Sequence, residues 1–184
     1  MREAVIVSTA RTPIGKAFRG AFNDTQAQEM AGHAIAEAVK RSKVSKEEID
    51  DVIIGAAGQQ GSQQGNIARQ SLLRAGLPVS VAGMSLDRQC ASGMMAIATA
   101  AKEITEDGMT ITVGGGVESV SLVRNENFRM DRARDPWLEK NIPSLYMTMI
   151  ETAENVAKRY GISREAQDEY SLQSQMRTAK AQQN

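Results

Sequence analysis

Four short apolar runs in the sequence predict strands. They cover residues 4–9, 51–56, 79–86 and 109–113, and polar or glycine-rich segments separate them. Continuous apolar runs of this kind are typical of strands that are covered on both faces, as in a parallel sheet.

Segments with apolar residues at helical spacing lie between these runs. Residues 25–39 and 66–74 predict two helices, and Gly76 and Pro78 end the second. Candidate capping boxes are Thr25 with Gln28, at the start of the first helix, and Ser45 with Glu48, before a short helical turn.

Residues 91–104 are helical in composition but small and apolar on nearly every side until Lys102. A helix without a polar face is normally buried all round. Strands that alternate with helices imply a largely parallel sheet, and a layer of helices between two sheets would bury such a helix. The sequence therefore predicts a layered α/β fold with a buried helix layer.

The character of the sequence changes after residue 121. Residues 122–145 are polar and irregular, and residues 148–159 and 163–183 predict two further helices. The simplest division is a sheet-containing core domain, residues 1–120, followed by a helical segment, residues 121–184.

Composition excludes several classes of protein. The 22 Lys and Arg residues equal the 22 Asp and Glu residues, so little would attract nucleic acid or an anionic membrane. One cysteine cannot form an internal disulfide. The N-terminus lacks a signal-peptide cleavage site, and no run approaches the roughly 20 apolar residues that span a bilayer. We expect a cytoplasmic protein.

Cys90 is the one residue with strong nucleophilic potential, although most lone cysteines are inert, buried small residues. It lies where a predicted strand ends and a predicted helix begins, so free backbone N–H groups and the helix dipole favour its thiolate. Ala91, Ser92 and Gly93 leave room for a substrate. The same N–H groups suit the oxyanion that forms when a thioester is attacked.

Four segments resemble the thiolase family, in the order in which thiolases carry them. They are IVSTARTPIGKAF near the start, DRQCASGMMAI around Cys90, GGGVESVS after the fourth run and MTMIETAENVAKRYGISREAQDEYSLQSQ near the end. The resemblance covers about the first half of a typical member. It implies the thiolase N-terminal core domain (1–120) and part of the loop domain (121–184), with the C-terminal core domain absent.

The resemblance also implies an activity. In thiolases the cysteine attacks a 3-ketoacyl-CoA or an acetyl-CoA, and the acyl-enzyme then transfers its acyl group to CoA or to a second acetyl-CoA. This implies that Cys90 is the catalytic nucleophile and that its N–H serves an oxyanion hole. Met149 would bind substrate near the acyl and pantetheine end, with core packing as the alternative. Coenzyme A thioesters would be substrates, with no bound cofactor and no metal.

The chain offers Cys90 no obvious base. Its single histidine, His33, lies in the middle of a predicted helix and is expected to be structural. Thiolases supply the activating His, an acid/base Cys and a water-binding Asn from a C-terminal half. We therefore expect that half as a partner that stays bound after cleavage of a longer chain. The alternative is a truncated chain that lacks this partner. A homodimer or homotetramer is expected by resemblance.

Some alternatives stay open. A ketoacyl-synthase-like condensing enzyme and a non-catalytic acyl-CoA- or lipid-binding relative would keep the same fold. Glu118 would either partner the cysteine loop or hold it in shape. Residues 114–116, three glycines, would either cradle a phosphate or form a tight turn after a strand.

Overall fold

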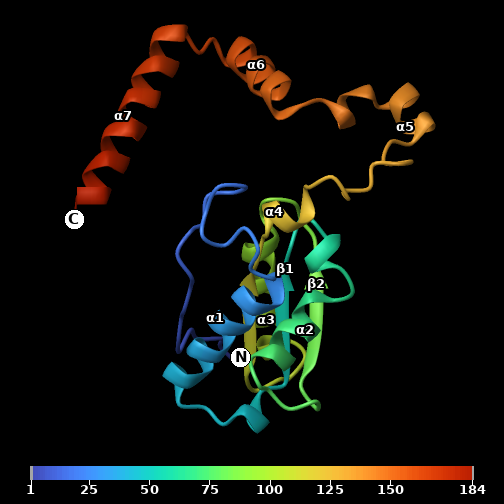
Figure 1. Cartoon of the computed structure of the whole chain (residues 1–184), viewed down its shortest axis with the longest axis vertical. Coiled ribbons are helices and arrows are strands. Elements are labelled where there is room, and N and C mark those ends of the chain that lie inside the picture. Colours follow the sequence, from blue (N-terminus) through green and yellow to red (C-terminus); the bar gives the residue numbers. More distant parts are fainter. Residues whose placement is uncertain (1, 184) are drawn as a thin grey trace. The chain divides into compact units, whose positions relative to one another are not determined.

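The computed structural model describes residues 2–183. The chain forms two compact units, Met1–Phe128 and Arg129–Asn184. The first unit contains the sheet, and the second consists of helices and connecting segments (Figure 1). The division into domains 1–120 and 121–184 remains a prediction about the family's domains.

Three parallel strands form the sheet of the first unit, in the order β2-β1-β3. The strands are β1 (Asp51–Gly55), β2 (Ala82–Leu86) and β3 (Thr112–Gly116). Asp51 is level with Ala82 on one side and with Thr112 on the other, so all three strands start at the same edge. This confirms the predicted α/β fold. The last strand lies further along the chain than the predicted 109–113 and includes the three glycines.

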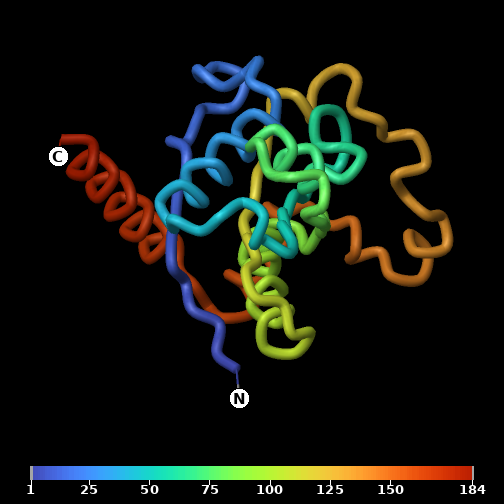
Figure 2. The backbone as a smooth tube through the Cα atoms, turned by 90° about the horizontal axis from the view of Figure 1, so that it is seen from below, coloured from blue at the N-terminus to red at the C-terminus, as the bar shows by residue number. Residues whose placement is uncertain are grey.

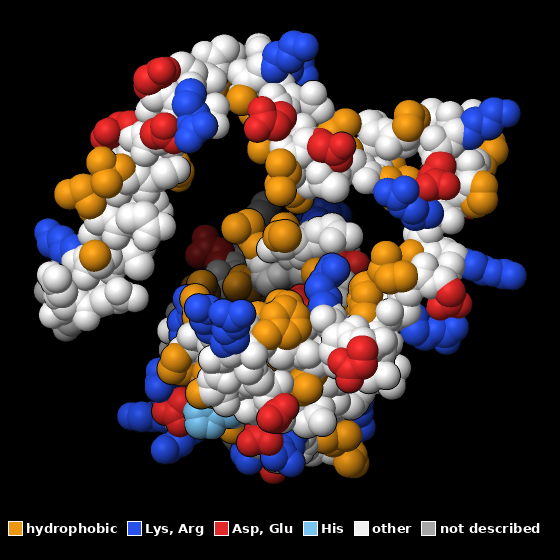
Figure 3. All heavy atoms as spheres, turned by 45° about the horizontal axis from the view of Figure 1, so that its top comes forward, with side chains coloured by type: hydrophobic (Ala, Val, Ile, Leu, Met, Phe, Trp, Pro, Cys, Tyr) orange, Lys and Arg blue, Asp and Glu red, His pale blue; other side chains and the backbone are white. Residues whose placement is uncertain are grey.

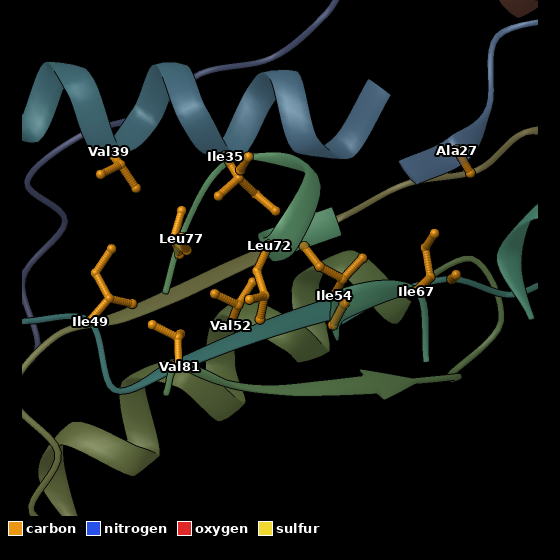
Figure 4. Packing of buried hydrophobic residues seen from close by; sticks show 13 residues of the cluster. Ala27, Ile35, Val39, Ile49, Val52, Ile54, Ile67, Leu72, Leu77 and Val81 are labelled. Carbon is orange, nitrogen blue, oxygen red and sulfur yellow. The ribbon is translucent and has the colours of Figure 1, made fainter. Parts of the chain in front are cut away.

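Helices cover both faces of the sheet (Figure 1). Helices α1 (Ala27–Ser42) and α2 (Ile67–Arg74) lie on one face, and α3 (Ser92–Thr105) lies on the other. Strand β1 contributes to both layers because its side chains alternate. Val52 and Ile54 belong to the cluster with α1 and α2 (Figure 4), whereas Ile53 packs with Ala96 and Ala100 of α3.

The predicted helix starts are partly confirmed. Ser45 N–H donates to the Glu48 carboxylate at 3.1 Å, so the capping box before η1 (Lys46–Glu48) is present. The Thr25 box is wrong, because the N-cap of α1 is Gln26 without a side-chain bond. Gln28 instead donates to Gln70 Oε1 at 2.7 Å, which ties α1 to α2.

The first predicted strand, residues 4–9, is wrong. The segment has no regular structure, and Val5 and Ile6 are 71% and 78% exposed. Side-chain bonds hold it, such as Arg41 Nη1 donating to the Thr9 carbonyl at 3.0 Å. A strand forms only where a neighbour accepts its backbone hydrogen bonds, and among the described residues no strand pairs with this segment.

Helix α3 is buried on one side only, contrary to the predicted burial all round. Ala96 and Ala100 face the sheet, while Met94 and Ile97 are 77% and 49% exposed. Nothing else in the first unit covers this outer face, because the described residues of that unit form a single sheet. The predicted second sheet over this helix is therefore not seen among the described residues of the first unit.

The second unit contains α5 (Pro136–Asn141), η3 (Pro143–Tyr146), α6 (Met149–Tyr160) and α7 (Arg164–Gln183), which can be followed from yellow to red in Figure 2. The two predicted C-terminal helices are confirmed. A capping box of Thr148 and Glu151 starts α6, and Gly161 ends it in the left-handed conformation. No residue between 129 and 183 is buried, so this unit lacks a core of its own.

No helix within residues 2–183 is both long enough and apolar enough to cross a membrane.

Candidate active site

The carboxyl ends of the three strands meet at one edge of the sheet. Because the strands are parallel and level, the segments after β1, β2 and β3 emerge side by side there. Ligand sites of open α/β sheets form at this edge. Cys90 lies in the segment that follows β2, between Leu86 and the start of α3.

Cys90 is exposed and belongs to a tight turn. Asp87 Oδ1 accepts the Gln89 N–H at 2.7 Å, and the Arg88 carbonyl accepts the Ala91 N–H at 3.1 Å. Gln89 has a φ of 50°, in the left-handed region that few side chains adopt. The turn therefore reverses the chain within a few residues and leaves the thiol at the surface, before the N-cap of α3.

Ser92, in the first turn of α3, is bonded to the same turn. Its Oγ accepts the Arg88 N–H at 2.8 Å and donates to the Gln89 carbonyl at 2.6 Å. The side chain is buried, with 4% exposed. The sequence interpretation treated Ser92 only as a small residue, and no pattern in the sequence indicates these two bonds.

Glycines bring the start of α3 unusually close to the sheet. A Cβ on Gly55 of β1 would lie 2.2 Å from the Ser92 carbonyl carbon, and one on Gly116 would lie 3.0 Å from Gly93 Cα. A Cβ on Gly114 would lie 2.8 Å from Ile97 Cα. The three glycines of residues 114–116 are thus strand residues under a helix. This corrects the interpretation of these glycines as a tight turn, whereas the phosphate cradle stays a prediction.

Glu118 holds the loop after β1 in place. Its carboxylate accepts the N–H groups of Ala57 at 2.8 Å and Gly58 at 3.2 Å, and the Gln63 side-chain amide at 2.8 Å. Gln63 is buried and its Oε1 accepts the Ser119 N–H. These bonds join the segments after β1 and β3. Glu118 therefore holds the loop after β1, whereas the sequence interpretation assigned it to the cysteine loop.

The other predicted site residues lie elsewhere. His33 is exposed on α1 (pale blue in Figure 3), on the opposite face of the sheet from α3. Met149 lies in the second unit, as the first residue of α6, and its side chain is 75% exposed. Its role in binding substrate remains a prediction. Within residues 2–183, no group of three or more His, Cys, Asp or Glu side chains is arranged to hold a metal.

Two buried carboxyl groups lie at the other end of the sheet. Asp51 begins β1, and Glu103 lies in the last turns of α3. Burial raises the pKa of both groups, and the nearby charges of Asp51 and Asp107 raise that of Glu103 further. Since they lie at the amino edge of the strands, these groups are not part of the cysteine site.

The comparisons with known proteins concern nearly the whole chain. The sequence model of the family described as "Thiolase, N-terminal domain" matches residues 4–184. Among curated proteins, the 3-ketoacyl-CoA thiolase of Bacillus subtilis (strain 168) is 40% identical over 98% of this chain and 46% of its own length.

Two further relatives have similar sequence identities. The 3-oxoadipyl-CoA/3-oxo-5,6-dehydrosuberyl-CoA thiolase of Escherichia coli (strain K12) is 39% identical over 99% of this chain and 49% of its own length. The acetyl-CoA acetyltransferase of Cupriavidus necator is 39% identical over 99% of this chain and 48% of its own length. The chain thus spans about half the length of the curated relatives that it matches.

Proposed function

Because the chain belongs to the thiolase family, we propose that it supplies the nucleophile of a coenzyme A-dependent acyltransferase, with Cys90 as the acyl-accepting residue. One observation carries the proposal. The only cysteine of the chain is exposed in a tight turn at the carboxyl edge of the sheet, directly before α3. This position suits a nucleophile, because a substrate can reach the exposed sulfur at the edge where ligand sites of parallel sheets form.

The proposed chemistry has two half-reactions. A base takes the proton of the Cys90 thiol, and the thiolate attacks the acetyl-CoA carbonyl and forms a new C–S bond. The C–S bond to CoA then breaks, and the leaving CoA thiolate takes the proton from the base. With a 3-ketoacyl-CoA the attack falls on the 3-keto carbon, and acetyl-CoA leaves after its carbanion is protonated. CoA or a second acetyl-CoA then removes the acyl group. The Cys90 N–H is a proposed donor to the oxyanion.

We further propose that a C-terminal half of the same protein is the partner of this chain. The exposed apolar side of α3, including Met94 and Ile97, and the unpaired apolar residues 4–9 support this. So does the length of the relatives. That half would also provide the base, since His33 lies on the other face of the sheet. A homodimer or homotetramer is proposed on family grounds alone.

Residues 121–184 are proposed to act as part of the family's loop domain, with Met149 beside the acyl or pantetheine end of the substrate. The exposure of Met149 within its own unit supports a surface role over core packing. The apolar side of α6, which includes Ile150 and Val156, is also exposed.

The test is chemical trapping of the acyl-enzyme. The chain is co-expressed with the C-terminal half of a relative, such as the B. subtilis 3-ketoacyl-CoA thiolase, and the assembly is isolated by size exclusion. It is incubated with acetyl-CoA, quenched in acid and mapped by peptide mass spectrometry. We expect an acetyl thioester on the Cys90 peptide and none in Cys90→Ala.

The alternatives give different results. An isolated assembly that binds acetyl-CoA without forming the thioester would refute the catalytic role and favour a non-catalytic binding relative. Loss of the acetyl group on addition of free CoA is expected for a thiolase. If free CoA does not remove it, a ketoacyl-synthase-like enzyme is favoured instead.

A further inference from the structure

We propose that Ser92 is a positioning residue for Cys90, one that sets the orientation of the peptide group between Gln89 and Cys90. This role rests on the proposed acyl transfer, and it explains how the Cys90 N–H, the proposed oxyanion donor, is held in one orientation. Ser92 does not touch the substrate in this proposal, and it acts through the backbone.

The hydroxyl of Ser92 uses both of its hydrogen-bonding capacities on the cysteine turn. It accepts the Arg88 N–H at 2.8 Å and donates to the Gln89 carbonyl at 2.6 Å. The Gln89 carbonyl also accepts the Ser92 backbone N–H at 3.1 Å. Two donors from one buried residue therefore converge on a single carbonyl oxygen, which leaves that carbonyl little freedom to rotate.

The Gln89 carbonyl and the Cys90 N–H belong to the same planar peptide group. A bond that fixes the direction of the carbonyl therefore fixes the direction of the N–H, which points the opposite way. Gln89 is held in the left-handed region, with φ of 50°, where a residue other than glycine needs support from its surroundings. The bonds from Ser92 and Asp87 provide that support.

Ser92 itself is anchored to the sheet. Its backbone lies so close to β1 that only glycine fits at position 55, and the residue is 4% exposed. A hydroxyl on a mobile surface residue would move together with the turn. Because Ser92 is packed against β1, its hydrogen bonds instead keep the turn in a fixed position on the sheet. The sheet, through Gly55 and Ser92, thus determines where the Cys90 N–H points.

The experiment separates oxyanion stabilisation from thiol reactivity. Alkylation of Cys90 by iodoacetamide forms no oxyanion. Cys90 is the one cysteine of this chain, so peptide mass spectrometry follows its adduct separately from those of the C-terminal half. In the assembly with a C-terminal half, we expect Ser92→Ala to lower the rate of acetylation by acetyl-CoA about tenfold or more, since one lost oxyanion donor costs ~100-fold or more. Alkylation should change less than about threefold, in line with a small helix-dipole effect. Ser92→Thr, which keeps a hydroxyl, should restore acetylation.

Ser71→Ala is the matched control. Ser71 is also a buried helical serine, but it lies on α2 and its hydroxyl has no partner among the described residues. It should leave both rates unchanged. Equal acetylation rates in wild type and Ser92→Ala would refute the inference, as would an equal loss of acetylation and alkylation. Absence of acetylation in the wild type would instead refute the proposed function.

A measurement on the wild-type protein covers the case in which Ser92→Ala does not fold. The Arg88 amide donates to a buried hydroxyl, so its hydrogen exchange should be at least about tenfold slower than that of an unbonded amide. Exchange of Arg88 at the rate of an unstructured peptide would refute the inference without any variant.

Discussion

At the scale of single residues, the absence of a side chain matters as much as its presence. Gly55 gives α3 room to approach β1, and this approach sets the position of Ser92 and hence of the cysteine turn. Ile54, one residue earlier, fills the opposite face of the same strand. Ile54 therefore fills the layer on one face with its side chain, whereas Gly55 lets α3 approach the other face because it has no side chain.

Gly55→Ala is expected to destabilise the fold by about 1–3 kcal/mol or more, the usual cost of overpacking, because its Cβ would lie 2.2 Å from the Ser92 carbonyl carbon. Urea unfolding followed by circular dichroism measures the change. Gly115→Ala is the control, since a Cβ there would meet Ile54 Cδ1 at an ordinary 3.6 Å. Equal stability of the two variants would show that α3 shifts freely on the sheet.

At the scale of elements, β1 and α3 also meet at the opposite edge of the sheet, through Asp51 and Glu103. Glu103 Oε2 has no hydrogen-bond partner among the described residues, and both side chains are buried. A buried carboxyl group favours its neutral form, which is why the pKa of each is raised. Ionisation of Asp51 or Glu103 therefore lowers the stability of the folded state.

Stability should accordingly depend on pH. Because the folded state raises the pKa of Glu103 above its unfolded value, the stability linked to its proton is present in acid and is lost as pH rises through the folded pKa. Glu103→Gln removes the charge, so we expect it to be more stable than wild type near neutral pH, with the gain shrinking toward about pH 4. Urea unfolding across this range is the measurement. Glu106→Gln is the control, because it removes the charge of an exposed glutamate that directly follows α3.

Local chemistry explains which elements the sequence predicts well. The predicted strand of residues 51–56 is found as β1, residues 51–55, because a continuous apolar run suits a strand that lies between two helical layers. Residues 4–9 have the same pattern but remain unpaired, since pairing depends on a neighbouring strand as well as on the segment itself. Likewise, three glycines look like a turn in a sequence, and only the position of α3 explains them as strand residues.

The candidate site is predictable to a similar extent. Cys90 is found from its motif and from its place at a strand–helix junction, and the structure places it in an exposed turn there. The bonds of Ser92 and the Glu118–Gln63 pair join residues that sequence patterns do not associate. The proposed role of Met149 depends on the family resemblance alone. Met149 also lies in a different unit from Cys90.

At the scale of the whole molecule, the two units differ in how they are stabilised. The first has a hydrophobic core on each face of its sheet, while no described residue of the second is buried. Helices without a core are stabilised mainly by their caps and by pairs such as Arg164 and Asp168, 2.9 Å apart. Such pairs contribute little at an exposed surface.

Limited trypsin digestion should therefore separate the units. We expect the first cuts at Arg129, Arg132 or Arg134, which are exposed and lie outside the helices, and a protected fragment that ends near residue 128. Mass spectrometry of early time points identifies the cut sites. Early cleavage at Arg74 or Lys102, within the first unit, would contradict this picture of its stability.

The burial of β1 on both faces affects how the correct register of this central strand is selected. All five residues of β1 are buried, so sliding it by one position would exchange its two faces without exposing an apolar side chain to water. Hydropathy therefore does not discriminate between the correct alignment and its neighbours. Gly55 does, because a slip would bring the bulkier Ile54 beneath the backbone of Ser92. In this molecule the alignment of the central strand is selected by size rather than by polarity.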